Sequence, residues 1–312
     1  MSSSITGSSP AAPGSRVRLR CLVARPDLNG EFATLISPVA DSEGRIVVEP
    51  ELSGPRDKAR LRVKPDNVEA AHALPRTLAA LQALVDAACV RGAGTRLRVP
   101  SGQFVCVGDG GGADGLTISS AISIVGAGDA TVFHFPVTVL RTAAGKLLEL
   151  TAFVVKGARV LVTGPGLQRV RLNDVTIHAE GVRSDALIFT DMERARGEPP
   201  LDHRIVVEHC SVFGGEDGVM VSVSGVEFKS CHIMGAQSRG IFGDNSFTIS
   251  RSTVHAHGYG LKLRGGCFAL GHNDFTPGPW DNMIHWFPLT KKDLEDPRFM
   301  PRHSEYGDNY YD

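Results

Sequence analysis

Apolar residues recur every 21 residues in the second half of the chain, and they do so in a fixed pattern. Each copy holds two alternating apolar positions, a gap of three residues and a second alternating pair. The four copies are Ile205, Val207, Cys210 and Val212; Val226, Phe228, Cys231 and Ile233; Phe247, Ile249, Ser252 and Val254; and Phe268, Leu270, Asn273 and Phe275. Because side chains alternate along a β-strand, each copy predicts two short strands that meet at a bend and face one core.

A third apolar pair follows each bend behind a turn, and one earlier copy precedes the four. The earlier copy is Val170, Leu172, Val175 and Ile177, and the third pairs are Leu187 and Phe189, Val219 and Val221, Ile241 and Gly243, and Leu261 and Leu263. A polar run with two prolines at 191–204 predicts a loop that lengthens one coil. A period of about 20 residues without helical phase is typical of a stacked solenoid. Three strands per coil predict a prism-shaped parallel β-helix.

The first half of the chain supplies the remaining features of a known family. A helix predicted at 75–91 is followed by the strand Arg96–Phe104 with its Pro-Ser-Gly turn, and then by Ile-Ser-Ile-Val-Gly-Ala-Gly-Asp at 122–129. Together with the repeats, these features resemble the right-handed parallel β-helix proteins of the pectin-lyase-like superfamily, over residues 75–290. The resemblance implies a mainly β fold, a three-sheet right-handed parallel β-helix with an N-terminal capping helix. Its members include lyases, hydrolases, epimerases, adhesins and intracellular binding proteins, so it implies a fold rather than a function.

Residues 16–70 predict a separate unit of short strands with turn signals between them. The stretch resembles the small SH3-like β-barrel modules that accompany ankyrin-repeat and other interaction domains. The residues that carry this resemblance are Leu22, Arg25–Gly30 and Lys64–Glu69. The remaining expected segments are a disordered tail at 1–15 and a C-terminal tail at 291–312.

Charge and hydropathy exclude several function classes. The chain has 33 basic and 34 acidic residues, so no whole-molecule field draws it onto nucleic acid or an anionic membrane. No apolar run approaches the roughly 18 to 20 residues that a membrane helix needs. The tail at 1–15 lacks the apolar core of a secretory signal. We therefore expect a cytoplasmic protein without membrane contact.

Basic residues alternate with apolar ones in two strands of the small barrel. Arg60 and Arg62 belong to the later strand, and Arg16, Arg18 and Arg20 to the first. The two sets form one basic patch if these strands are neighbours. The barrel as a whole is nearly neutral, so a solvated face is one interpretation and nucleic-acid binding is not expected. As candidate binding residues, Arg60 and Arg62 make the barrel a second binding surface for an acidic or protein partner.

Four polar residues hold equivalent places just before the third strand of successive coils. They are Asp185, Asp217, Arg239 and Tyr259. Because coils stack about 4.8 Å apart, these side chains should form one row. A uronate lyase or epimerase uses such groups, since it must neutralise a sugar carboxylate, remove the C5 proton and donate to the leaving oxygen. The alternative interpretation is turn chemistry, because Asp before Gly is a common turn pair.

Hydrolase and metal chemistry have weaker support. The Asn-Thr-Asp set of the sugar hydrolases in this superfamily is missing, so an inverting glycoside hydrolase ranks below a lyase. The cysteines show no zinc spacing, and Cys210 and Cys231 are expected to be stacked free thiols. His178 and His255 are equivalent in the repeat but lie three coils apart, so we expect no metal site. No cofactor is expected either, apart from calcium if the chain is a lyase.

An apolar row is predicted on the outward side of the third strand, at Ile188, Met220, Phe242 and Ile284. Exposed apolar rows usually mark a contact surface. With the incomplete acid set and the appended barrel, this row favours a non-catalytic intracellular binding protein whose partner is an acidic polysaccharide or a protein. The alternative is a carbohydrate-active enzyme, a polysaccharide lyase or uronate epimerase before a glycoside hydrolase.

Overall fold

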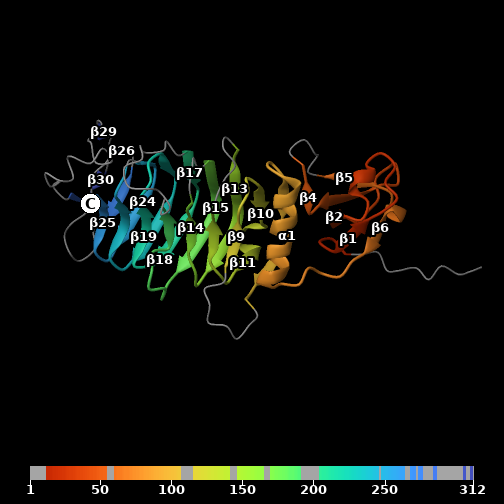
Figure 1. Ribbon diagram of the computed structural model, residues 1–312, viewed down its shortest axis with the longest axis horizontal. Helices are drawn as coiled ribbons and strands as arrows, with labels where there is room; N and C mark the ends of the chain where they lie inside the picture. The colour runs from red at the N-terminus through yellow and green to blue at the C-terminus, as the bar shows by residue number, and fades with distance from the viewer. Residues whose placement is uncertain are drawn as a thin grey trace, which may run out of the picture.

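The computed structural model describes residues 12–54, 60–106, 115–140, 146–164, 169–190, 204–245, 247–263, 268–271, 273–276, 284–286, 305–306 and 310–311, with side chains up to residue 263 and at 271 and 273. The described chain forms a right-handed parallel β-helix, as predicted from the repeats. Figure 1 shows the coils side by side along the long axis, with one helix between them and a small N-terminal sheet. The expected tails and the loop at 191–204 fall mostly outside the described residues.

Each coil contributes strands to three columns that run along the solenoid. The first column contains β7 (Arg96–Arg98), β10 (Ser123–Val125), the first part of β13 (Leu148–Lys156), the first part of β15 (Arg169–Ala179), β17 (Arg204–Glu208), β20 (Val226–Lys229), β23 (Phe247–Ser250), β26 (Phe268–Gly271) and β29 (Glu305–Tyr306). The second column contains β8 (Gly102–Phe104), β11 (Thr131–Phe133), the second parts of β13 and β15, β18 (Ser211–Gly214), β21 (His232–Ala236), β24 (Thr253–Ala256), β27 (Asp274–Thr276) and β30 (Tyr310–Tyr311). The third column contains β9 (Leu116–Ile118), β12 (Val137–Val139), β14 (Val160–Val162), β16 (Leu187–Phe189), β19 (Asp217–Val221), β22 (Arg239–Gly243), β25 (Tyr259–Leu263) and β28 (Ile284–Trp286).

Strands within each column pair in parallel, and the first two columns join into one sheet. The joining strands are β13 and β15, which run through the bend without a break. The third column forms its own sheet of eight strands. The predicted repeat register is confirmed, because Val207 pairs with Phe228 and Phe228 with Ile249 in successive coils. All three are 1% exposed, so the 21-residue period marks the inward positions of the first column.

The bend between the first and second columns is made by one left-handed residue per coil. Positive φ values of 51° to 57° occur at Ala152, Asp174, His209, Ser230 and Arg251. This conformation is uncommon for residues with a side chain. It turns the strand sharply and accounts for the gap of three in the apolar pattern.

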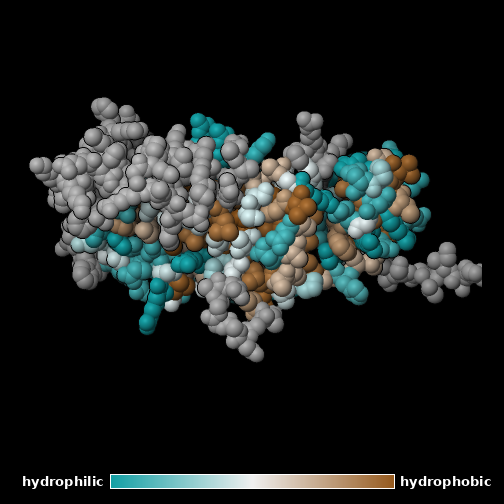
Figure 2. Space-filling view, in the orientation of Figure 1, coloured by the Kyte–Doolittle hydropathy of each residue, from teal (hydrophilic) through white to brown (hydrophobic). Residues whose placement is uncertain are grey.

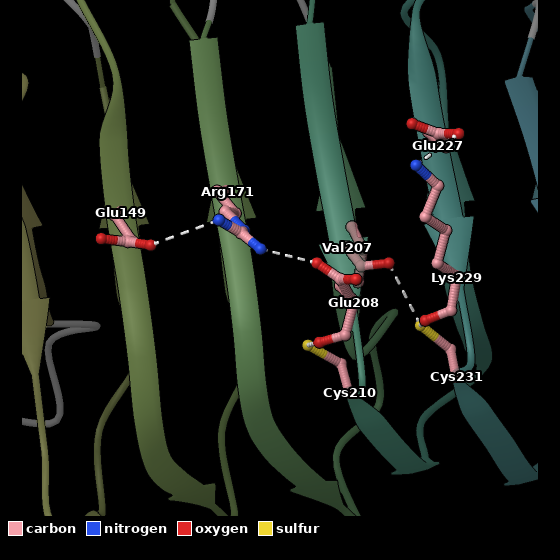
Figure 3. Close-up of polar contacts among 8 residues, drawn as sticks. All are labelled: Glu149, Arg171, Val207, Glu208, Cys210, Glu227, Lys229 and Cys231. Carbon is pink, nitrogen blue, oxygen red and sulfur yellow. Dashed lines mark hydrogen bonds and ion pairs between the residues drawn. The ribbon is translucent and has the colours of Figure 1, made fainter.

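A ladder of small polar groups fills the inside of this bend. The backbone N–H of Cys231 donates to Ser252 Oγ at 3.0 Å, and that of Ser252 donates to Asn273 Oδ1 at 3.0 Å. Cys210 and Cys231 continue the ladder as buried free thiols, and Cys231 Sγ lies 3.4 Å from the Val207 carbonyl oxygen (Figure 3). Burial raises the pKa of Cys210 to about 12 and that of Cys231 to about 11. Both thiols are therefore neutral and unreactive at physiological pH.

Helix α1 (Leu78–Arg91) packs against the first coil of the solenoid. Its start is capped by Thr77, whose Oγ1 accepts the N–H of Ala80 at 3.2 Å. Its buried side chains, Leu78, Leu81, Val85 and Ala88, belong to the same core cluster as the coils. Gln82 substitutes for a missing strand at the edge of β9, because its side-chain amide exchanges two hydrogen bonds with the backbone of Thr117, at 2.8 and 2.9 Å. These contacts support the capping role, which stays a prediction.

The N-terminal residues form a five-stranded antiparallel sheet with its own core cluster. Its strands, in the order in which they pair, are β5 (Leu61–Val63), β3 (Ile46–Pro50), β2 (Phe32–Ser37), β1 (Arg16–Leu19) and β6 (Val68–Ala70), with short 3-10 helices η1 (Pro26–Leu28) and η2 (Pro65–Asn67). The SH3-like assignment of this sheet stays a prediction. The surface of this unit is mainly hydrophilic in Figure 2, whereas hydrophobic residues are visible over α1 and the neighbouring coils.

One segment of the N-terminal unit crosses to the solenoid. Strand β4 (Leu52–Ser53) pairs antiparallel with β7, the first strand of the first column, and Leu52 belongs to the solenoid core. Glu49 is nearly buried and its Oε1 lies 2.6 Å from Arg98 Nη2. The expected division between residues 16–70 and 75–290 stays a prediction, but β4 ties the two units together.

Within the part of the chain that the structure describes, no helix combines the length and the hydropathy of a membrane span.

Candidate functional site

The structure brings the predicted polar row together on the third column. Asp217, Arg239 and Tyr259 each begin a strand, β19, β22 and β25, and they pair with one another in that order. Asp185 lies two residues before β16, in the preceding coil. Gly218 and Gly240 follow the first two of these residues, and a Cβ at either would lie 2.7 Å or less from a neighbouring backbone or side-chain atom. The glycines thus bring successive turns close enough for side chains of this row to touch.

Asp217 and Arg239 form a closed ion pair. The Asp217 side chain is 1% exposed, and Arg239 Nε donates to its Oδ1 at 2.6 Å while Nη2 donates to Oδ2. Such a planar two-point contact satisfies the guanidinium fork and both carboxylate oxygens. Asp185 contacts the pair only through its Oδ1, which accepts the backbone N–H of Asp217 at 3.2 Å. The Asp217 carboxylate therefore turns toward Arg239, while Asp185 reaches only the backbone N–H of Asp217.

The electrostatics of Asp217 follow from this burial. Loss of solvent raises the pKa of Asp217 above its ordinary value, and the bonds from Arg239 oppose that rise. The nearby charges of Asp185 and Glu216 add to the rise. With both oxygens occupied and almost no exposed surface, the carboxylate cannot reach a bound substrate without opening the pair.

Two aromatic rings lie beside cations on the outer side of the same column. Arg239 Cζ is 4.0 Å from the ring centroid of Phe242, and Lys262 Nζ is 5.1 Å from that of Tyr259. Both distances fall within the range of cation–π attraction. Partial burial lowers the pKa of Lys262, and the positive charge of Arg239 lowers it further, against the opposing effect of Asp217. Lys262 was not among the predicted catalytic residues, although it lies on the same strand as Tyr259, β25.

Three members of the predicted outward apolar row lie on adjacent strands. Ile188, Met220 and Phe242 pair in register through adjacent strands, and Lys262 follows Phe242. Met220 and Phe242 are partly exposed, while Ile188 is 9% exposed. Ile284 was placed in this row wrongly. It pairs with the fully buried Leu261, and His285 occupies the register opposite Lys262.

A one-residue shift explains the error at Ile284. The sequence between the last two strands of the third column, 264–283, contains several turn residues, and its length does not follow the preceding turns. Because side chains alternate along a strand, a shift of one residue exchanges the inward and outward positions. The side chain of Ile284 lies outside the described set.

The outer face of the first column carries a different row, which sequence reasoning missed. Arg171 Nη2 donates to Glu208 Oε2 at 2.8 Å, and its Nη1 lies 3.9 Å from Glu149 Oε1 (Figure 3). In the following coil, Lys229 Nζ lies 2.9 Å from Glu227 Oε1. The hydrogen bond that Arg171 donates to Glu208 holds the pKa of Glu208 below its ordinary value. Opposite charges at matching positions of adjacent coils could have predicted this row. The extra residues at 191–204 break the 21-residue period between Arg171 and Glu208, so the sequence does not align the two.

The basic residues of the N-terminal sheet do not form one patch. Strand β1 lies between β2 and β6, and β5, which carries Arg62, lies at the far edge of the sheet. Arg62 Nη1 is 3.6 Å from Asp41 Oδ2, and Arg18 and Arg20 lie 3.8 and 3.5 Å from carboxylate oxygens of Glu69. Arg60 is exposed just before β5. The condition for a joint patch, adjacency of the two basic strands, is not met.

Comparison with known proteins adds information on the fold. Among solved structures, the A-module of the mannuronan C-5 epimerase AlgE6 of Azotobacter vinelandii is similar at 14% identity and a TM-score of 0.39, over 75% of this chain and 83% of that chain. ORF18 of Geobacillus virus E2 is similar at 10% identity and a TM-score of 0.38, over 90% of this chain and 71% of that chain. No curated protein matches the sequence. A family model described as a right handed beta helix region matches residues 199–276, the coils that hold Asp217, Arg239 and Tyr259.

Proposed function

We propose that this protein binds an acidic polysaccharide along the outer face of its third column and does not catalyse its breakdown. The observation that carries the proposal is the closed Asp217–Arg239 pair, with Lys262 next to it against the ring of Tyr259 and in register with Phe242. The cytoplasmic location and the identity of the sugar stay expectations.

The closed pair removes two of the groups that uronate chemistry needs. Proton abstraction at C5 requires a base within hydrogen-bond reach of that proton and a cation that neutralises the adjacent carboxylate. Asp217 is buried and both of its oxygens are bonded, so it is not available as the base. Arg239 already holds one carboxylate, so a substrate carboxylate would have to displace Asp217 and leave it unpaired in the interior, at high cost.

The remaining groups suit binding. Lys262 supplies one positive charge, and its partial burial, which lowers its pKa, strengthens its attraction to an anion. Tyr259 and Phe242 offer apolar rings against which a sugar can pack, and Met220 extends this surface into the preceding coil. Coils stack about 4.8 Å apart, so a polymer lying along the column would meet the same outward strand position once in every coil.

Calorimetric titration with polygalacturonate, polymannuronate and polyguluronate, each with and without calcium, tests the proposal. The sharpest variant is Lys262→Gln, with Lys229→Gln on the first column as its matched control, because both remove one lysine charge. We expect Lys262→Gln to weaken binding by about tenfold or more, which corresponds to roughly 1.4 kcal/mol, and Lys229→Gln to leave it unchanged. Equal losses in both variants would mean unspecific charge attraction. Binding to none of the three polymers would reject an acidic glycan and leave a protein partner for this face.

A uronate lyase or epimerase is the second candidate, because one observation favours it. Tyr259 lies beside Lys262, and a lysine whose pKa is lowered exchanges a proton more readily near neutral pH. Lyase turnover produces an unsaturated uronate that absorbs in the ultraviolet, and epimerisation exchanges the C5 proton with solvent. Either signal in the wild type, lost in Tyr259→Phe, would replace the binding proposal. A glycoside hydrolase has less support, because it needs two accessible carboxyl groups and Asp217 is not one.

A further inference from the structure

A cluster of metal-ligating side chains lies on the second column, away from the row at Asp217. His255 is in β24 and His257 directly follows that strand, while Met234 is in β21. Met234 pairs with His255 in register across the two strands. Two histidines and a methionine thus lie on neighbouring strands at one place on the outer surface. Sequence reasoning weighed the histidines alone and did not consider Met234, which comes from the adjacent coil.

The geometry places all three on the same side of the sheet. Ala256, between the two histidines, is fully buried, so His255 and His257 point outward on either side of it. Met234 is 38% exposed, an unusual position for a large apolar side chain. The register shifts between Met234 and Ala236, and Gly235 in that shift has a φ of 71°. Such a bulge redirects side chains at the edge of a strand and is common beside functional sites.

We propose that His255, His257 and Met234 bind a copper(I) ion. The two imidazole ring centroids are 6.4 Å apart and inclined at 63°. With a metal–nitrogen bond of about 2.0 Å, two imidazoles on one ion have ring centroids at most roughly 6.3 Å apart. The observed separation lies at this upper limit, so small side-chain rotations bring one nitrogen of each ring onto a shared ion, with the Met234 sulfur as the third ligand.

The ligand types select copper(I) over the commoner metals. Thioether sulfur is a soft ligand that favours copper(I), whereas calcium and magnesium require oxygen ligands and structural zinc takes four nitrogen, sulfur or carboxylate ligands. Among the described residues, no group of three or more His, Cys, Asp or Glu side chains is arranged to hold a metal. Among the described residues, His255 and His257 therefore lack the further His, Cys, Asp or Glu ligands that a structural zinc site needs.

The same row contains an internal control. His178 occupies the position of His255 three coils earlier, and it pairs with Lys156 and Phe213 on its two sides. Glu180 takes the place of His257, and His178 Nδ1 donates to Glu180 Oε1 at 3.2 Å. The His178 ring also stacks on Phe213, with centroids 4.9 Å apart. A histidine in the same fold position thus lacks both the second imidazole and the sulfur.

Anaerobic titration of copper(I) in competition with bathocuproine disulfonate tests the site. The exposed thiols of Cys21 and Cys106 bind copper(I) themselves, so accessible cysteines are first alkylated. We expect one copper(I) per chain, with affinity lowered about tenfold or more by Met234→Leu or by His257→Gln, and unchanged by His178→Gln. Affinity should also fall in acid, because protons compete for imidazole nitrogen.

The outcomes separate the alternatives. Met234→Leu keeps the size and apolar character of an exposed side chain, so an unchanged melting temperature shows that lost affinity reflects the sulfur. No copper(I) bound after alkylation, or equal losses in Met234→Leu and His178→Gln, would overturn the proposal. Zinc(II) bound as tightly as copper(I), with Met234→Leu without effect, would also overturn it, because the sulfur would then take no part.

Discussion

The outer faces of the first and third columns come from the same coils, yet they treat charge in opposite ways. On the first column, Arg171 and Glu208 pair across coils with 43% and 24% of their side chains exposed. On the third, the corresponding figures for Arg239 and Asp217 are 22% and 1%. On the first face, the charged side chains pair with one another while exposed to water. On the third face, the ion pair is largely buried, and the rings of Phe242 and Tyr259 and the side chain of Lys262 lie on the outer side. The proposal that a ligand binds the third face rests on this contrast.

This difference arises because the repeat constrains only the inward positions. Phe228 and its equivalents must be apolar to fill the core, whereas outward positions are free to vary between coils. Asp217 departs from this rule, since it begins a strand at a corner and turns its carboxylate into the turn beneath Arg239. Corners are therefore the places where a polar residue can be either structural or functional, and its burial distinguishes the two.

The largest expected effect comes from reversing an inward position of the first column. Phe228 is 1% exposed and its ring lies 6.1 and 6.2 Å from those of Phe189 and Phe247. Phe228→Asp should abolish cooperative unfolding, because an unpaired buried charge costs several kcal/mol on top of the lost packing, about 3–5 kcal/mol. Circular dichroism on heating measures this, with the adjacent outward variant Lys229→Ala as the control. A soluble Phe228→Asp protein that melts cooperatively would disprove the register.

The next effect comes from opening the buried pair of the third face. Arg239→Ala leaves the Asp217 carboxylate buried without its partner, so the free energy of unfolding should fall by about 3–5 kcal/mol. Replacing both residues with apolar ones of similar size, Asp217→Leu with Arg239→Met, should recover most of the loss. Urea denaturation measures both. If Arg239→Ala costs less than 1 kcal/mol, the pair opens readily and Arg239 is free to bind a substrate.

Some of this fold could be predicted from the sequence, and the reason is physical. The 21-residue spacing of Val207, Phe228 and Ile249 sets the coil, the strand register and the inward face together. The gap of three in each copy marked the bend, although its left-handed residues, such as His209 and Ser230, are not distinguished by type. Repetition is informative because each coil must stack on the next.

The remaining features depend on contacts that no local pattern contains. Strand β4 was missed because two residues inside the N-terminal unit, Leu52 and Ser53, carry no strand signal of their own. The row of Asp217 and Arg239 was found, but its inward turn was not, since a sequence does not show which corner side chains are enclosed. Ile284 was misplaced because the length of an irregular turn sets its register.

A smaller effect is expected on the exposed pair of the first face. Arg171→Ala removes contacts to Glu208 and Glu149 that are open to water, so the free energy of unfolding should fall by only about 0.2–1 kcal/mol. The loss should shrink further in 1 M salt, where screening is strong. The same urea denaturation compares this variant with Arg239→Ala. A cost equal to that of the third-face pair would remove the distinction between the two faces.

The smallest effect is a pH dependence of opposite sign on the two faces. The pKa of Glu208 is lowered by Arg171, so its contribution to stability is full above the ordinary carboxyl pKa and is lost as pH falls through the folded-state value. The pKa of Asp217 is raised by burial, so the folded state takes up a proton first and this residue favours folding as pH falls. Urea denaturation between about pH 7 and pH 3.5 separates the two, because Glu208→Gln should reduce the acid loss and Asp217→Asn should deepen it. The same sign in both variants would mean that Asp217 is held ionised by Arg239 as firmly as Glu208 is by Arg171, and that burial does not set its pKa.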